Sequence, residues 1–236
     1  MKYIVTGTGR CGTVYAAKFL TSLGIPCGHE TIFNWQGLEF AKKRLNKEYP
    51  RHLSGASKTT FNFGNPVHGD DWVDVDVIEA ESSYMAAPYL DSDILKDVKI
   101  IHFVRHPSRV INSFCNFLGY FSKSSFTNIY ERFIYSKFPV LQHEMSQYDR
   151  AALYYILWNK QIKSHFFQRL EDPKDDLMDF LGSKSDHFFD QKNANTFAKP
   201  SKKFQLCNLE NKKIKSNLID LGLEYGYDMN ENKMVF

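Results

Sequence analysis

Cysteine pairs, glycosylation sequons and long apolar runs are missing from this sequence. Its four cysteines form no C-x-x-C pair and show no metal-site spacing with histidine, so we expect neither a disulfide framework nor a metal centre. No N-x-[ST] sequon occurs, and no apolar run reaches the roughly 18 residues of a membrane-spanning helix. Because a first strand is expected two residues after Met1, we also expect no signal peptide, and a cytoplasmic location with reduced thiols.

Strong charge of one sign is also absent, and so are linkers and repeats. The 236 residues carry a formal net charge of +3, which is too small and too scattered to indicate a nucleic-acid partner. No repeat and no Pro/Gly/Ser-rich linker divides the chain. A single domain over residues 1–236 is therefore expected.

A glycine-rich turn near residue 10 indicates a cradle for phosphate. An apolar strand over residues 3–6 runs into Gly7-Thr8-Gly9-Arg10-Cys11-Gly12-Thr13, and a helix-forming stretch follows at once. Gly9 and Gly12 let the backbone bend so that loop amides and the helix N-terminus converge on an anion. The P-loop of ATP-binding proteins has Lys and then Ser or Thr after its last glycine, whereas Thr13 and Val14 stand here. The loop thus predicts a phosphate-like ligand and argues against magnesium-dependent ATP chemistry.

A second junction between a strand and a helix presents another basic side chain. The apolar stretch Lys99–Val104 leads into Arg105-His106-Pro107, and Pro107 is well suited to the first position of a helix. An arginine that ends an apolar strand directly before such a helix start indicates an anion site.

The order of elements predicts an α/β fold, with a central parallel sheet flanked by helices. A buried helix is expected over residues 14–23, closed by Gly24 and Pro26. Alternating valine and aspartate over residues 73–79 predict a second strand, and residues 151–161 a buried helix whose aromatic residues belong to the core. In such sheets ligands bind at the carboxyl ends of the strands, where both basic motifs and the Glu79/Glu81 segment are expected to meet.

Together these segments resemble the sulfotransferases that use 3'-phosphoadenosine 5'-phosphosulfate (PAPS). The first loop of that family reads like K/R-S-G-T-T and its second motif like R-x-P-x-x-x-x-x-S, and residues 10–14 and 105–113 are similar to them. Residues 28–30, 81–88, 169–172 and 225–228 look similar in the same order. The resemblance implies that the first loop binds the 5'-phosphosulfate and the second motif the 3'-phosphate, with a late loop closing over the latter. The implied cofactor-binding residues are Gly9, Arg10, Cys11, Gly12, Thr13, Val14, Arg105, Ser113, Lys199, Ser201 and Lys202.

The general base has three candidates. Glu79 and Glu81 share parity on an extended strand, so both could face the site, and the E-x-S-[WY] register of the resemblance selects Glu81 while an E-K-[ST]-P-S-Y register selects Glu79. We prefer Glu81 because it lies nearer the strand end. His29 is the third candidate, and it could instead contact the acceptor together with Glu30. Arg10 would neutralise charge on the leaving side.

The expected activity is metal-independent, in-line transfer of a sulfuryl group to a hydroxyl or amine of a small-molecule, lipid or carbohydrate acceptor. Two irregular stretches, residues 42–72 and 121–150, are expected to cover the acceptor pocket. Two alternatives stay open at this point: a divergent P-loop kinase, and a nucleotide-binding module without turnover.

Overall fold

Five short parallel strands form one sheet in the order β2-β3-β1-β4-β5. The computed structural model describes residues 1–48, 77–122, 128–183 and 203–229. The strands are β1 (Tyr3–Thr6), β2 (Cys27–His29), β3 (Ala80–Ser82), β4 (Lys99–Val104) and β5 (Phe166–Arg169). All four pairings are parallel, which confirms the predicted α/β class with a parallel central sheet.

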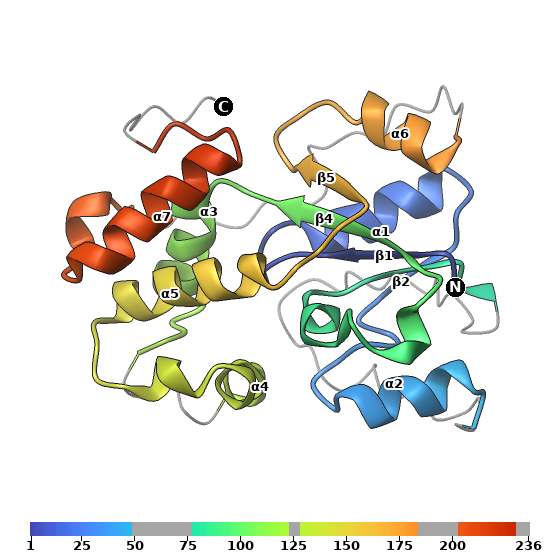
Figure 1. Ribbon diagram of the computed structural model, residues 1–236, viewed down its shortest axis with the longest axis horizontal. Coiled ribbons are helices and arrows are strands. Elements are labelled where there is room, and N and C mark those ends of the chain that lie inside the picture. Colours follow the sequence, from blue (N-terminus) through green and yellow to red (C-terminus); the bar gives the residue numbers. More distant parts are fainter. Residues whose placement is uncertain (49–76, 123–127, 184–202, 230–236) are drawn as a thin grey trace.

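Helices connect and cover these strands (Figure 1). The α-helices are α1 (Thr13–Ser22), α2 (Leu38–Leu45), α3 (Pro107–Asn112), α4 (Ile129–Lys137), α5 (Gln147–Lys160), α6 (Asp175–Leu181) and α7 (Lys212–Glu224). Shorter turns are the 3-10 segments η3 (Tyr84–Tyr89), η4 (Asp93–Leu95), η6 (Pro139–Gln142) and η8 (Leu206–Asn208), and the π-helical turn η5 (Ser113–Phe117).

Local sequence explains where the site-bearing helices begin and end. Helix α1 starts after Gly12, whose φ of 106° favours glycine, and Gly24 follows its end with a φ of 79°. Pro107 opens α3, and the His106 ring accepts a hydrogen bond from the Ser108 amide as its cap. The expected helix over residues 14–23 and the strand Lys99–Val104 are thus confirmed, the helix to within a residue.

The two faces of the sheet pack against different helices. On one face Val5, Ile101 and Phe103 lie in a buried cluster with residues of α1 and α6. On the other face Ile4 packs with residues of α2, η3 and η4. In Figure 1, α3, α4, α5 and α7 gather beside the carboxyl ends of β1 and β4.

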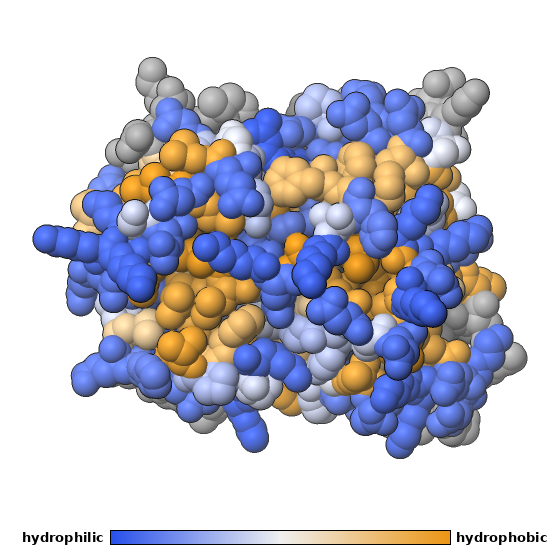
Figure 2. Space-filling model, viewed as in Figure 1, coloured by the Kyte–Doolittle hydropathy of each residue, from blue (hydrophilic) through white to orange (hydrophobic). Residues whose placement is uncertain are grey.

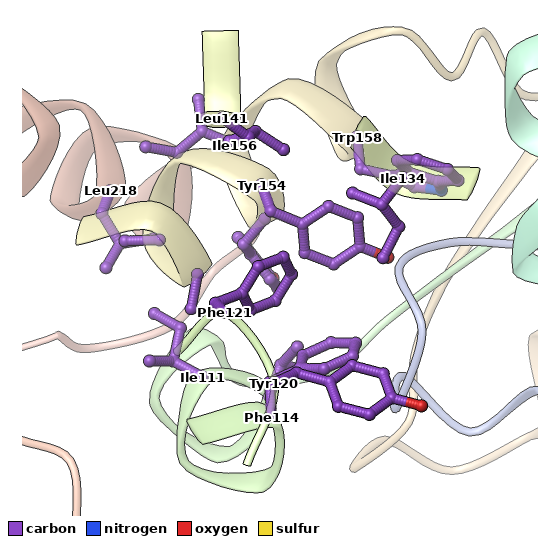
Figure 3. Packing of buried hydrophobic residues seen from close by; sticks show 14 of the residues in the cluster. Ile111, Phe114, Tyr120, Phe121, Ile134, Leu141, Tyr154, Ile156, Trp158 and Leu218 are labelled. Atoms are coloured by element: carbon purple, nitrogen blue, oxygen red, sulfur yellow. The ribbon is translucent and has the colours of Figure 1, made fainter. Parts of the chain in front are cut away.

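These last helices enclose an aromatic core (Figure 3). Tyr154 and Trp158 of α5 are fully buried, and their ring centroids lie 5.1 Å apart. Phe114 and Phe121 pack on Tyr154 with centroid distances of 5.3 Å and 5.4 Å. Such aromatic pairs anchor α5 firmly against the segment that follows α3.

The sequence misplaced the second strand of the sheet. The expected strand over residues 73–79 lies partly outside the described residues, and in its described part Val77 is 55% exposed. The strand that pairs with β1 is instead Ala80–Ser82. Residues 42–48 complete α2 and its end, residues 121–150 include α4, η6 and the first turn of α5, and most of the first irregular stretch lies outside the described residues.

Hydrophilic side chains cover much of the face that Figure 2 shows. Figure 2 shows apolar groups emerging between hydrophilic side chains on one face. Among the described helices, none combines the length and apolar character needed to cross a membrane.

Candidate active site

Each of the five strands delivers a site segment at its carboxyl end. The glycine loop follows β1, Glu30 follows β2, and Ser83 follows β3. Arg105 follows β4, and Leu170 with Glu171 follows β5. The parallel sheet therefore brings segments that are far apart in the sequence to one edge, as expected for a ligand site of this fold.

The glycine loop is packed too closely for side chains. A Cβ at Gly7 would collide with the Phe103 carbonyl oxygen, and one at Gly9 would lie 2.9 Å from Phe114 Cζ. At Gly12 it would meet Leu170 Cδ1 at 2.8 Å, in a backbone conformation that other residues rarely adopt. The loop is thus clamped between β4, η5 and the turn after β5.

Some amides of the loop have acceptors in the loop or in α5, and others lie at the start of α1. Gly9 N donates to the Tyr154 hydroxyl at 3.0 Å, and Cys11 N donates to the Thr8 carbonyl at 3.2 Å. Both amides thus have acceptors within the protein. The first amides of α1, on Thr13 and Val14, have no acceptor within their own helix, and no acidic residue stands in its first turn, so this end favours an anion.

Arg10 and Arg105 converge beside the loop. Arg10 has a φ of 68°, and its Nε donates to Ser113 Oγ at 2.9 Å. Arg105 Nη1 donates to the Arg10 carbonyl at 3.3 Å, while its buried Nε has no hydrogen-bond partner among the described residues. Burial lowers the pKa of Arg10, and the charge of Arg105 lowers it further. Two partly buried like charges and an unpaired N–H together favour an anionic ligand.

The carboxylate of Glu171 lies beside the second basic motif. Glu171 accepts hydrogen bonds from the His106 amide at 3.3 Å and the Tyr227 hydroxyl at 2.8 Å, and lies 3.9 Å from Arg109 Nη1. Its charge counteracts the lowering of the Arg105 pKa by burial. The turn after β5 and the residues after α7 therefore help to orient the second basic motif.

His29 and Glu30 line the opposite side of the loop. His29 Nε2 lies 3.2 Å from Thr13 Oγ1 and 3.8 Å from Glu30 Oε1. Glu30 has a φ of 54°, and its side chain is 19% exposed. Burial, and secondly the charge of Glu81, raise the pKa of Glu30 to about 8. A carboxyl group with a pKa near 8 is a stronger base than an ordinary carboxylate, so in its ionised form it is suited to accept a proton beside the anion cradle.

Glu81 and Glu79 do not line the glycine loop as His29 and Glu30 do. Glu81 is fully buried within β3, and its Oε1 accepts hydrogen bonds from the Ile32 and Phe33 amides at 2.9 Å and 3.3 Å. Glu79 precedes β3 and bonds Lys2 at 2.7 Å with 42% of its side chain exposed. The expectation that Glu79 lies at the carboxyl end of the strand is therefore wrong, because it lies at the amino end.

Two tyrosines of α5 and a serine of β3 support the site and were missed by the sequence. Tyr154 holds the Gly9 amide, and the Tyr155 hydroxyl donates to the Arg105 carbonyl at 2.9 Å. Ser82 Oγ donates to the Thr13 carbonyl at 2.7 Å. Aromatic residues in a buried helix are typical of a core, so the sequence offered no signal for the two hydroxyls.

The remaining predicted residues divide into two groups. Cys11 is buried, and burial raises the pKa of its thiol to about 12, so it stays protonated at neutral pH. Lys199, Ser201 and Lys202 lie outside the described residues. Within the described part of the chain, no three His, Cys, Asp or Glu side chains are grouped as metal ligands would be.

Comparison with known proteins adds no identity to this geometry. Neither the models of known protein families nor the curated proteins include a match to the chain.

Proposed function

We propose that the protein transfers a sulfuryl group from PAPS to a hydroxyl or amine of an acceptor. The observation that carries the proposal is the convergence of Arg10, Arg105 and Ser113 at the glycine loop, with a buried Arg105 N–H left unpaired among the described residues. This spacing of two arginines from two strand ends suits a ligand with two separate anionic groups.

The residues present fit such a ligand. The amides at the start of α1 and the side chain of Arg10 would hold the 5' end, and Arg105 with Ser113 would hold the 3'-phosphate. When bound, PAPS supplies an activated sulfuryl group whose leaving side is a phosphate.

The chain's own residues supply two functions. The guanidinium group of Arg10 lies where it can neutralise charge that develops on the leaving side. Glu30, with its raised pKa, is the group that we assign to accept the acceptor's proton, and His29 orients it from 3.8 Å. This assignment replaces our preference for Glu81, which is buried and bound to amides.

Calorimetric titration with adenosine 3',5'-bisphosphate tests the proposal directly. We expect the wild-type protein to bind it and Arg105→Ala to lose at least about tenfold in affinity, as for a charged partner removed from a partly buried site. Arg132→Ala, on the exposed side of α4, is the matched control and should bind like the wild type.

A parallel titration with ATP and a transfer assay separate the alternatives. Tighter binding of ATP with Mg²⁺ than of the bisphosphate would contradict the proposal and favour a divergent P-loop kinase. Binding of the bisphosphate without transfer to any small-molecule, carbohydrate or lipid acceptor would favour a nucleotide-binding module. The cytoplasmic location expected from the sequence stays a prediction.

A further inference from the structure

Glu81 is an ionisable residue in the middle of the sheet. It pairs in register with Ile4 of β1 on one side and with Gly28 of β2 on the other, and it is fully buried. Carboxyl groups are rarely fully buried without a specific partner, because desolvation opposes their charge. Its place in β3 therefore calls for a function beyond filling the core.

The hydrogen bonds that Glu81 accepts come from the segment that follows β2. Its Oε1 receives the amides of Ile32 and Phe33. Its Oε2 lies where a Cβ of residue 28 would be, so Gly28 provides its space. That Oε2 has no hydrogen-bond partner among the described residues. Next along β3, Ser83 Oγ donates to the Phe33 carbonyl at 2.6 Å, which fixes the same segment from a second point.

We propose that Glu81 is a positioning residue for the proton-accepting side of the site: its carboxylate anchors residues 31–33 and thereby holds Glu30 and His29 against the glycine loop. The assignment of Glu30 as the proton acceptor rests on the proposed function. The anchoring itself rests on the contacts of Glu81 alone.

The anchor explains the unusual backbone of Glu30. A non-glycine residue with a φ of 54° is uncommon and persists where its surroundings hold it. The two amides bound by Glu81 follow directly after residue 31, so they fix the chain at the exit of this strained position. Glu30 in turn remains beside His29 and Thr13.

The anchor also acts on Glu30 through charge. The groups in electrostatic contact with the Glu30 side chain include His29, Glu81, Tyr84, Tyr120, Tyr130 and Tyr154. Glu81 supplies a second carboxyl in this set, and Arg44 of α2 partly offsets its charge. Two carboxyls in a dry site disfavour simultaneous ionisation, so the charge of Glu81 raises the pKa of Glu30 and makes the ionised Glu30 a stronger base.

Two variants separate anchoring from charge. Glu81→Gln keeps a carbonyl oxygen for the Ile32 and Phe33 amides and removes the charge, whereas Glu81→Ala removes both. Glu79→Gln is the matched control, because Glu79 lies two positions earlier but bonds Lys2 at the surface. The Glu30 carboxyl is followed by ¹³C NMR titration, assigned by the signal that Glu30→Gln loses, and backbone anchoring by amide hydrogen exchange at Ile32 and Phe33.

In Glu81→Gln we expect the Glu30 titration midpoint to fall by about one pH unit or more. In Glu81→Ala we expect the Ile32 and Phe33 amides to exchange about tenfold faster or more. Glu79→Gln should leave both unchanged. An unshifted Glu30 midpoint in Glu81→Gln, or exchange at Ile32 and Phe33 that no Glu81 variant alters, would overturn the proposal.

Both measurements are made on the protein without nucleotide. If the protein fails to bind adenosine 3',5'-bisphosphate, the proposed function fails while the role of Glu81 can still be read. If it binds the nucleotide and neither Glu81 readout moves, the positioning role fails alone. If Glu81→Ala does not fold, Glu81→Gln still decides the effect of the charge.

Discussion

Gly12 combines two demands at one position, a left-handed backbone and the absence of a side chain. Its φ is 106°, and a Cβ there would come within 2.8 Å of Leu170. Gly24 makes the first demand alone, with a φ of 79° and open space around its Cα. A comparison of substitutions at Gly12 and Gly24 therefore separates the effect of backbone strain from the effect of steric exclusion at the glycine loop.

We predict that Gly12→Ala and Gly24→Ala each lower the free energy of unfolding by about 1 kcal/mol from backbone strain, and that Gly12→Ala costs more because Leu170 must move. Urea denaturation measures both losses. Gly12→Ala should also weaken binding of adenosine 3',5'-bisphosphate, whereas Gly24→Ala should bind normally. Equal affinity in the two variants would contradict the cradle.

The burial of His102 makes the stability of the protein depend on pH. His102 is 3% exposed and bonded to Asn159 at 2.9 Å, and burial lowers its pKa to about 4. Between that value and the ordinary pKa of about 6.5, the unfolded chain binds a proton that the folded chain does not. Stability should therefore fall as the pH drops from 6.5 towards 4, by on the order of 3 kcal/mol.

The free energy of unfolding of the wild type should be lower at pH 5 than at pH 7. In His102→Gln the part of this difference that His102 causes should disappear. His143→Gln, which changes an exposed histidine, should keep the wild-type difference. A wild-type pH dependence in His102→Gln would show that other groups cause the loss.

Glu30 and Glu81 show which features of a single residue could be predicted from the sequence and which could not. The sequence placed His29 and Glu30 near the site through the segment that they occupy, and the structure brings both to Thr13. It favoured Glu81 over Glu79 but left the register open, because parity along a strand does not say where the strand begins. The exposed ion pair of Glu79 and the buried amide contacts of Glu81 become visible only in three dimensions.

Helix α5 connects the two basic motifs at the scale of elements. Tyr154 bonds the loop after β1, and Tyr155 bonds the residue after β4. A third tyrosine of the same helix, Tyr148, donates to Asn116 Oδ1 at 2.9 Å instead. The helix thus sets the separation of the two basic motifs through the hydroxyls of Tyr154 and Tyr155.

We predict that Tyr154→Phe and Tyr155→Phe each destabilise the fold by about 1 to 2 kcal/mol, because a buried amide or carbonyl loses its partner. Both should weaken binding of adenosine 3',5'-bisphosphate although neither is assigned to touch it. Calorimetry with Tyr148→Phe as the control checks this. A comparable loss of affinity in Tyr148→Phe would indicate a general effect of α5.

Elements were predicted well where burial dictates composition. The apolar stretch of β4 and the glycine-bounded α1 lie where the sequence placed them. β3 was missed because its residues are Ala80, Glu81 and Ser82, all fully buried, so the strand carries no apolar alternation. The alternating valine and aspartate residues at 73–77 fit the sequence pattern of a strand better than the residues of β3 do.

At the scale of the molecule, the two ends of the sheet carry different sets of residues. The carboxyl end carries the glycine loop, Glu30 and Arg105, whereas the amino end carries Lys2 with Glu79. Parallel order makes this division, since every strand points the same way.

We therefore predict that Glu30→Gln lowers the rate of sulfuryl transfer by about 10²-fold or more, as expected when a general base is removed. Glu79→Gln should leave the rate unchanged and cost less than about 1 kcal/mol of stability, because exposed ion pairs contribute little. Initial rates with radiolabelled PAPS measure the first effect, once an acceptor is found. A loss of rate in Glu79→Gln comparable to that in Glu30→Gln would contradict the division.

The central place of β1 has a consequence for how the chain matures. β1 pairs with β3 at residues 80–82 and with β4 at residues 99–102, so both of its neighbours are made long after it. A nascent chain that ends before β4 leaves the buried side chains of Ile4 and Val5 beside an open strand edge, which is prone to aggregation. Ribosome-bound chains of this protein should therefore depend on chaperones until β4 has emerged, and folding should be slow for the molecule's size.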